Sequence, residues 1–549
     1  MSDKHRDDSY IFMTRPFWYE MNVSMNLVKQ KYAEYLGEEE TVIEKRSDAV
    51  SLLSRITLQI QELMVQRLKT ENPSVVIKDL YKIFDECFHF YMKQKEARKK
   101  LTELRINDSS IGDTFEENRN MARSVIDSVN LWLENSVLFQ DRIGEPYNQD
   151  TFELNQELFI DMYIYGTASR ALSLLNLSRK FGEKVLYYGI KITPSQNEPI
   201  DILVYHPVIY FNTLLTGNQD IFSVPLEEYK NASNSEFGKG FASVYKMDFL
   251  FALRTMSTLQ SEMLKDGKYA FTVVDRPDLE KWIDYYTEGK VSGKCFVDAF
   301  ALTKDNVSSQ LRNNDPIIWI MGTNKYRHEI RPLICLENDR IAISHQALEQ
   351  AKHLWLSIFS NGGMIYTNAE DDLTRAIEKR NEELSDRLVD ILREKLHAHY
   401  DAGFDEIDVQ YYRIFGERDY NYGDYDIVFY AKDAKELFLI EAKFFSDSLT
   451  NSGMITDYEK MFKKKGYYEH CRKRYDLVLS EPEKVKNFIG VTGKIAVHCL
   501  FVSSKPLEIE FQDDDSVVSF PCLSIFDDYL EGKLLPEYGD DPVRPVHKI

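Results

Sequence analysis

The chain has 549 residues, 43% of them hydrophobic, and a formal net charge of −21 at pH 7. Its length predicts two to four domains, and its hydrophobic content is sufficient for packed cores, which argues against wholesale disorder. The acidic balance argues against a protein that coats nucleic acid through its overall charge, although it does not exclude local basic patches.

The cysteines and the N-terminal residues indicate a cytoplasmic protein. The six cysteines include no CxxC pair, which excludes the usual zinc-ribbon spacing and favours reduced thiols. Residues 1–20 are charged and lack the apolar core of a signal peptide. No run approaches the roughly eighteen apolar residues that a membrane helix requires, so we expect no membrane partner.

Residues 1–182 are predicted to form a helical domain. Apolar side chains recur at three- and four-residue spacing within 49–68, which is typical of one buried helical stripe. The predicted helices are 49–68, 76–104, 114–139 and 150–180, with a break at Asn72-Pro73-Ser74 and a polar loop at 107–112. We expect this bundle to scaffold, oligomerise or sense, and we interpret its basic run at 93–100 as a solvated helix face rather than a nucleic-acid contact.

Residues 183–360 are predicted to form a mixed α+β domain, because short runs rich in Val, Ile and Tyr alternate with helical patterns. The predicted strands are 185–192, 200–211, 269–274, 317–321, 333–336 and 341–343, and the predicted helices are 346–359 and a part of 238–264. No motif in this region identifies a function.

Residues 361–535 are predicted to form an α/β domain, followed by a loose tail at 536–549. An amphipathic helix is predicted at 369–399. Strands at 407–415, 427–430 and 437–440, a helix at 457–479 and a strand at 494–502 complete the order helix, three strands, helix, strand.

Two of these strands carry acidic residues and a lysine at their ends. Glu441 and Lys443 project to the same face of an extended chain, and Ala442 turns away. If the two strands pair as a hairpin, Asp426 approaches Glu441 across the ladder. The stretch Asp433-Ala434-Lys435 has the same acidic-x-lysine spacing, but it falls in the expected turn, where its side chains would enter water.

The pattern Asp-x(n)-Glu-x-Lys at strand ends, together with the element order, resembles the PD-(D/E)xK nuclease superfamily. The resemblance covers only the C-terminal part. It implies a restriction-endonuclease-like α/β fold, with a mixed central sheet flanked by helices. Tyr425 stands where the namesake pattern has proline, a residue that is often missing there.

The resemblance implies a catalytic site that binds Mg²⁺ or Mn²⁺. Asp426, Glu441 and the backbone carbonyl of Ala442 would hold the metal, since Mg²⁺ prefers oxygen ligands. Lys443 would orient the attacking water or stabilise developing negative charge. The alternative for Asp426, Glu441 and Lys443 is a surface salt-bridge cluster at a hairpin edge.

For two pairs of acidic residues, the sequence leaves open which member would bind the metal. Many members of the superfamily add a glutamate from the helix before the sheet, and Glu383 is favoured here with Glu382 as a close second. A solvated helix face explains either residue equally well. Asp424 competes with Asp426, which is favoured because its spacing to Glu441 suits a shorter hairpin.

The helix predicted at 457–479 is basic in an otherwise acidic chain. We expect its cations to neutralise phosphates beside the cutting site, giving affinity without sequence readout. An ordinary solvated basic face is the alternative. The expected nucleic-acid contacts are Lys460, Lys463, Lys464, Lys465, Arg472, Lys473 and Arg474.

The expected function is therefore a metal-dependent endonuclease that hydrolyses nucleic-acid phosphodiesters, with DNA favoured over RNA. We expect regulation by the N-terminal regions, a homo-oligomer, and a setting in bacterial anti-phage defence or restriction with a partner protein of that system. One alternative is a non-catalytic nucleic-acid-binding, assembly or sensor protein with a degenerate nuclease fold. Another is a metal-independent ribonuclease, because Arg393 and His399 resemble the Arg-x(4–6)-His pair of HEPN ribonucleases.

Overall fold

The structure, a computed structural model, describes most of the chain. The described residues are 18, 25–36, 41–43, 46–71, 73–103, 109–140, 155–181, 190–192, 226–265, 271–311, 315–318, 326–362, 371–445, 460–461, 465–505, 517–534, 542–544 and 547–549. Among them, no helix is both long and apolar enough to cross a lipid bilayer. The chain is a mixed α/β protein built from helices and three small sheets.

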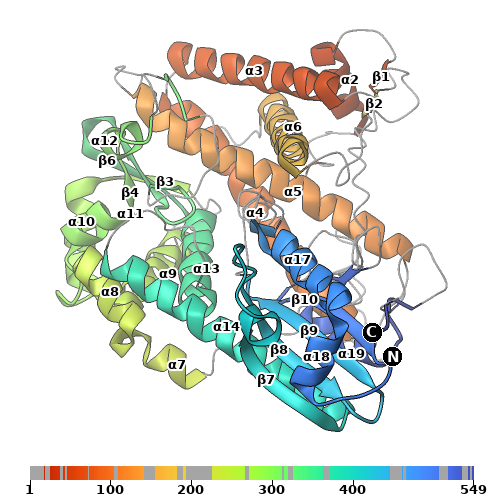
Figure 1. Ribbon diagram of the computed structural model, residues 1–549. Helices are drawn as coiled ribbons and strands as arrows, with labels where there is room; N and C mark the ends of the chain where they lie inside the picture. The colour runs from red at the N-terminus through yellow and green to blue at the C-terminus, as the bar shows by residue number, and fades with distance from the viewer. Residues whose placement is uncertain are drawn as a thin grey trace, which may run out of the picture.

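The N-terminal part is the predicted helical bundle (Figure 1). Its helices are α2 (Met25–Leu36), α3 (Arg46–Thr70), α4 (Pro73–Glu103), α5 (Ser109–Ser136) and α6 (Gln156–Phe181). Pro73 starts α4, where its missing N–H costs nothing. The loop predicted at 107–112 is wrong from Ser109 onward, where α5 already begins, and residues 107–108 lie outside the described residues. Strands β1 (Thr41–Ile43) and β2 (Ile190–Ile192) form a small antiparallel pair.

The middle part is mixed, as predicted. Its helices are α7 (Leu226–Lys230), α8 (Glu236–Tyr245), α9 (Phe249–Lys265), α10 (Arg276–Tyr286), α11 (Gly293–Phe300), α12 (Lys304–Ser308) and α13 (His345–Asn361). Its sheet has the order β3-β6-β5-β4, from β3 (Phe271–Asp275), β4 (Ala301–Leu302), β5 (Leu333–Leu336) and β6 (Arg340–Ser344).

Some predicted strands of the middle part are not present as predicted. Ile317 and Ile318 are not in a strand, and the rest of 317–321 lies outside the described residues. The strand at 200–211 also lies outside them, and of 185–192 only Ile190–Ile192 is described as a strand. The strands at 269–274, 333–336 and 341–343 are confirmed to within two residues.

The bundle and the middle part share one hydrophobic core, although they are separate stretches of sequence. Leu302, Ile334 and Ala342 of the middle part belong to the same buried cluster as Phe84 of α4 and Trp132 of α5. The predicted boundary at residue 182 therefore does not separate two hydrophobic cores.

The C-terminal part has the predicted order of elements around a five-stranded mixed sheet. The strands are β7 (Ala402–Gln410), β8 (Asp424–Ala431), β9 (Glu436–Lys443), β10 (Ala496–Ser503) and β11 (Val518–Ser519), in the order β11-β10-β9-β8-β7. Strands β7, β8 and β9 are antiparallel neighbours, whereas β9, β10 and β11 run parallel. The helices are α14 (Asp372–His399), α15 (Tyr411–Phe415), α17 (Tyr467–Ser480), α18 (Pro482–Ile489) and α19 (Phe526–Leu530).

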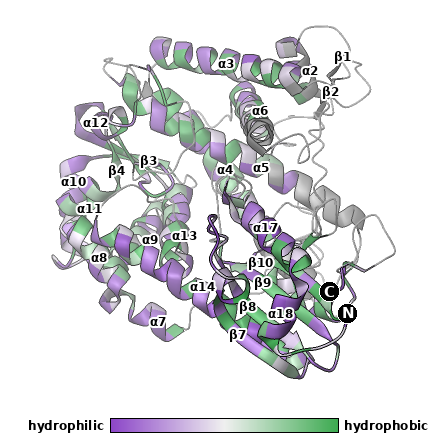
Figure 2. Cartoon of the chain, in the orientation of Figure 1, coloured by the Kyte–Doolittle hydropathy of each residue, from purple (hydrophilic) through white to green (hydrophobic). Residues whose placement is uncertain are grey.

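Helices cover both faces of this sheet. Leu388, Leu392 and Leu396 of α14 pack against the face that carries Phe429 and Ile440. Cys471, Tyr475 and Val478 of α17 pack against the opposite face, with Leu437 and Leu439. Figure 2 shows hydrophobic and hydrophilic residues sharing these helices, as expected for amphipathic helices between a sheet and water.

Helix α14 belongs to two cores. Leu373 and Ile377 near its start are buried with the middle part, whereas Leu388, Leu392 and Leu396 are buried with the C-terminal sheet. In Figure 1 this helix runs from the green region to the cyan strands. One continuous helix therefore links the predicted 183–360 and 361–535 segments.

Three local predictions are wrong. Residues 411–415 form helix α15 instead of the end of a strand. The helix predicted at 457–479 is interrupted: Lys460 and Met461 are helical, but α17 begins only at Tyr467, because Lys465 has a positive φ of 61° and Gly466 is the extended N-cap of α17. The described end of the tail is not loose, since Ile495 and Ile549 exchange two backbone hydrogen bonds and Val543 is buried.

Candidate active site

The predicted hairpin forms, and Asp426 and Glu441 lie at its open end. Strands β8 and β9 pair with Ile427 opposite Ile440, and the same register continued by one residue places Asp426 opposite Glu441. The stretch Asp433-Ala434-Lys435 lies in the exposed turn at the other end. The prediction that this second acidic-x-lysine stretch faces water is therefore confirmed.

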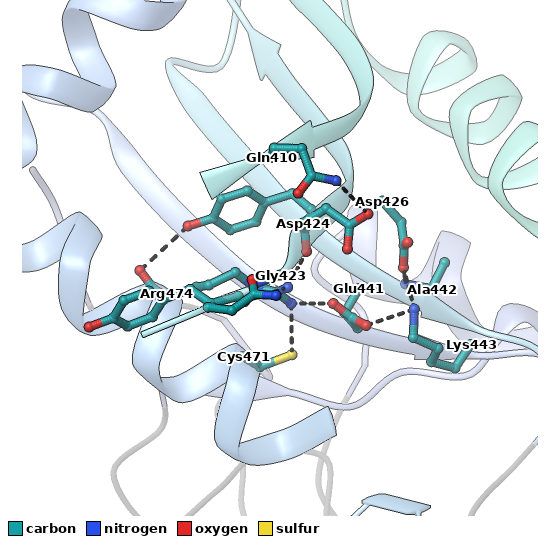
Figure 3. Close-up of polar contacts among 12 residues, drawn as sticks. Gln410, Gly423, Asp424, Asp426, Glu441, Ala442, Lys443, Cys471 and Arg474 are labelled. Atoms are coloured by element: carbon teal, nitrogen blue, oxygen red, sulfur yellow. Dashed lines mark hydrogen bonds and ion pairs between the residues drawn. The ribbon is translucent and has the colours of Figure 1, made fainter. Parts of the chain in front are cut away.

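Lys443 joins the two carboxylates. Its Nζ lies 2.9 Å from Asp426 Oδ2 and 2.7 Å from Glu441 Oε1 (Figure 3). The backbone N–H of Ala442 donates to the same Asp426 oxygen over 2.6 Å. The structure thus brings together the three side chains that the sequence singles out, and they come from two neighbouring strands.

Asp424 does not join this group. Its side chain accepts a hydrogen bond from Gln410 Nε2 at 3.3 Å (Figure 3), whereas the carboxylates paired with Lys443 are those of Asp426 and Glu441. Asp426, which the shorter hairpin spacing favours, is therefore the aspartate beside Glu441.

Glu383 does not join this group, contrary to the prediction. Its side chain is 52% exposed and pairs with Arg380 at 3.2 Å. The reason is the face of the sheet: Leu437, Leu439 and Glu441 alternate onto the α17 side, whereas α14 covers the other side. Glu382, the close alternative, is also exposed on α14.

Arg474 is a member of the site that the sequence assigned to the protein surface. It is 3% exposed, and its Nη2 donates to Glu441 Oε2. Its Nη1 donates to the backbone carbonyls of Tyr422, at 3.3 Å, and of Asp424. Gly423 permits this approach, because a Cβ on it would lie 3.2 Å from Nη1 and its φ is +77°. Arg474 therefore contacts the candidate metal ligand Glu441 instead of solvent.

A sequence signal for this burial exists. Cys471, Arg474, Tyr475 and Val478 recur at the three- and four-residue spacing of a buried helical stripe, and all four are buried. Charge alone suggests an exposed arginine, but its position in this stripe indicates the interior.

The other predicted basic contacts are distributed unevenly. Lys465 is exposed, and Lys460, Arg472 and Lys473 are half-buried. Lys473 pairs with Glu469, and its Nζ lies 4.0 Å from the centre of the Tyr420 ring. Lys463 and Lys464 lie outside the described residues.

The charged groups of this cluster shift one another's pKa. Burial, and then the charge of Glu441, raises the pKa of Asp426 to about 6. Burial also acts to raise the pKa of Glu441, but Arg474 and Lys443 outweigh it and hold this pKa below its ordinary value. Burial acts to lower the pKa of Lys443, yet Glu441 and Asp426 raise it above its ordinary value. Glu441 and Lys443 are therefore charged at neutral pH.

The carboxylates of Asp426 and Glu441 fit a magnesium site in which the protein supplies only a few of the ligands. The ammonium of Lys443 acts as a stand-in cation: one oxygen from each carboxylate converges on it, at 2.9 and 2.7 Å. Mg²⁺ is commonly held by one or two carboxylates, with water and substrate phosphate completing its octahedron. No cluster of three or more His, Cys, Asp or Glu side chains suited to a metal occurs in the described part of the chain. The fit therefore rests on Asp426 and Glu441.

The Arg393 and His399 side chains do not form a common site. Arg393 makes two hydrogen bonds to Asp405, at 3.1 and 2.6 Å, whereas His399 lies 3.3 Å from Asp527. These separate partners give no support to the HEPN-like alternative.

No protein family, curated protein or solved structure matches this chain. Its function must therefore be inferred from the chemistry of the Asp426, Glu441, Lys443 and Arg474 cluster.

Proposed function

We propose that the chain is a metal-dependent endonuclease that hydrolyses phosphodiester bonds in nucleic acid, DNA in preference to RNA. One observation carries the proposal: two carboxylates from adjacent strand ends converge on a single cation position, 2.9 and 2.7 Å from the Lys443 nitrogen. The mixed sheet with helices on both faces supports a restriction-endonuclease-like domain.

Asp426, Glu441 and the carbonyl of Ala442 are the groups that would hold Mg²⁺ or Mn²⁺. When bound, the metal would acidify a water molecule and neutralise charge on the phosphate. The reaction adds the water oxygen to phosphorus and breaks one bridging P–O bond, and the water proton ends on the leaving oxygen. A phosphodiester and water thus give a phosphomonoester and an alcohol.

Lys443 and Arg474 would divide two tasks. With the carboxylate oxygens engaged by a metal, the Lys443 ammonium would have donors available for the attacking water or a phosphate oxygen. Arg474 stays on Glu441 Oε2 and keeps Oε1 directed towards Lys443. The buried guanidinium would therefore fix the carboxylate without touching the substrate.

The rest of the chain supports a regulated enzyme. Helix α14 enters both the core of the middle part and the core beneath the candidate site. A change in packing near Leu373 can thus reach the sheet through one rigid element. We propose that this layout serves bacterial anti-phage defence or restriction, as a homo-oligomer with a partner protein of that system.

One observation favours a non-catalytic alternative. Asp426, Glu441, Lys443 and Arg474 carry charges that cancel, and both oxygens of Glu441 already have cationic partners. A cluster satisfied in this way can stabilise a degenerate nuclease fold used for nucleic-acid binding, assembly or sensing.

A cleavage assay separates the two functions. Plasmid DNA, single-stranded DNA and RNA are incubated with the full chain in Mg²⁺, Mn²⁺ or EDTA, beside Lys443→Ala. The nuclease requires cleavage that depends on metal and is lost in the variant. Absence of cleavage on all three substrates, with any partner supplied, favours the non-catalytic alternative.

A further inference from the structure

A row of four tyrosines lies beside the candidate site. Ring centroids are 5.8 Å apart between Tyr412 and Tyr411, 5.2 Å between Tyr411 and Tyr422, and 4.8 Å between Tyr422 and Tyr420. Tyr412 is 48% exposed, Tyr420 and Tyr422 are half-buried, and Tyr411 is buried. We call Tyr411, Tyr412, Tyr420 and Tyr422 the tyrosine row.

The row ends at the candidate active site. The carbonyl of Tyr422 accepts a hydrogen bond from Arg474, which also holds Glu441. Tyr411 N–H donates to the carbonyl of Gly423, so the two ends of the intervening loop are closed on each other. Rings and carboxylates are thus parts of one locally fixed unit.

The charges around the row do not suit a long duplex. Lys473 lies over Tyr420, but Glu469 already pairs with it. Arg413 pairs with Glu406, Arg418 pairs with Glu481, and the loop adds the exposed acids Glu417 and Asp419. Acids thus outnumber cations among these described residues, whereas binding along a duplex backbone needs a surplus of cations.

Aromatic rings suit unpaired nucleotides instead. Bases in a duplex are stacked on each other, whereas an unpaired base has a free face that can stack on tyrosine whatever its sequence. Such stacking strengthens binding by roughly 5- to 150-fold per base. Lys473 can leave Glu469 for a phosphate, because this pair lies at the surface.

We propose that the tyrosine row binds unpaired nucleotides next to the scissile phosphate, so that the substrate is single-stranded or locally unpaired nucleic acid. This proposal rests on the proposed nuclease function. It adds the class of substrate, and it adds base stacking as a source of binding affinity that does not require a basic surface.

Equilibrium binding tests the proposal without requiring catalysis. Fluorescence anisotropy in EDTA compares a labelled mixed-sequence single strand of DNA, the same sequence as RNA, and the DNA duplex, with the full chain. We expect at least one single strand to bind more tightly than the duplex. We expect Tyr412→Ala and Tyr420→Ala each to weaken that binding by roughly 5-fold or more, and Tyr420→Phe to preserve it.

Tyr285→Ala is the matched control, because Tyr285 on α10 is 80% exposed and outside the row. It should leave binding unchanged, and thermal melting should show that all variants are folded. Equal or tighter binding of the duplex, no binding at all, or unchanged binding by both alanine variants would overturn the proposal. Tyrosine-dependent binding without cleavage would support the role of the tyrosine row and refute the proposed nuclease function. Cleavage that is unchanged by both tyrosine substitutions would support the nuclease function and refute the role of the row.

Discussion

Arg474 holds Glu441 from the interior of the protein, with Nη2 of the guanidinium donating to Oε2 of the carboxylate. Both side chains are buried, so neither charge can turn to water if the other is removed. Glu441 also receives Lys443 on its other oxygen. The geometry of the candidate site thus depends on a residue 33 positions away in the sequence.

Replacing Arg474 should therefore destabilise the fold. Arg474→Met removes a buried partner and leaves two backbone carbonyls without their donor, at a cost of about 3–5 kcal/mol in the free energy of unfolding. Arg474→Lys should retain only part of the stability that Arg474→Met loses, since an ammonium lacks the planar fork that reaches Glu441 and both carbonyls together. Urea unfolding measures the difference. Lys473→Met is the control and should cost less than about 1 kcal/mol, because its ion pair is at the surface; equal losses in the two methionine variants would contradict this role.

Lys443 should compete with a metal ion for the carboxylates. In Lys443→Ala the cluster keeps Asp426, Glu441 and Arg474, so its local charge becomes negative. We expect this variant to bind Mn²⁺ more tightly than the wild type, on the order of tenfold, while losing cleavage. Isothermal titration with Mn²⁺ measures this affinity. Unchanged or weaker binding would mean that the carboxylates do not form the metal site.

A second buried ion cluster should fasten the bundle to the middle part. Arg327 pairs with Glu134 of α5 at 2.7 Å and with Glu329 at 2.8 Å, and all three are buried. Arg327→Leu leaves two carboxylates without their cation and should cost about 3–5 kcal/mol in urea unfolding. Arg276→Leu, which breaks partly exposed pairs with Glu280 and Asp298, should cost less than about 1 kcal/mol. Similar costs for the two variants would contradict the assignment.

His328 should make stability depend on pH. Burial, and then the charge of Arg327, lowers the pKa of His328 from 6.5 to about 3. Its ring meets Tyr81 of α4 and Asn130 of α5, while its backbone N–H donates to Glu134. The unfolded chain therefore binds more protons between pH 3 and 6.5, and stability falls as pH drops through this window.

From pH 7.5 to 5.0 this group should remove about 2 kcal/mol of unfolding free energy. The difference between the wild type and His328→Gln isolates it, because every other titrating group is common to both. Urea midpoints at the two pH values provide the measurement, with the half-exposed His353→Gln as control. The same pH dependence in the wild type and His328→Gln would show that His328 is not held neutral.

Local sequence patterns predicted the hairpin of the candidate site correctly, but they did not predict how distant elements pack against it. The hairpin of Asp426 and Glu441 spans few residues, so strand alternation and one turn determine its register. The face covered by α14 depends on contacts with the whole sheet, and this is why Glu383 was misplaced. Residues 411–415 are rich in aromatic and β-branched side chains but form α15, so the surrounding packing overrides their strand propensity.

The tail shows a second limit of local reasoning. Ile549 pairs with Ile495 through backbone groups, which leave no pattern in the sequence. Arg474, by contrast, was predictable, because its place in the 471, 474, 475, 478 stripe indicates burial. Periodicity was therefore more informative than charge at this position.

Cleavage by a matched pair of aspartate variants tests the central claim most directly. Asp426→Asn removes a carboxylate beside Lys443, whereas Asp433→Asn makes the same change in the exposed turn that shares the acidic-x-lysine spacing. We predict Mg²⁺-dependent cleavage of single-stranded DNA by the wild type and Asp433→Asn, and a loss of about 10²-fold or more in Asp426→Asn. Cleavage by Asp426→Asn at the wild-type rate would contradict the account.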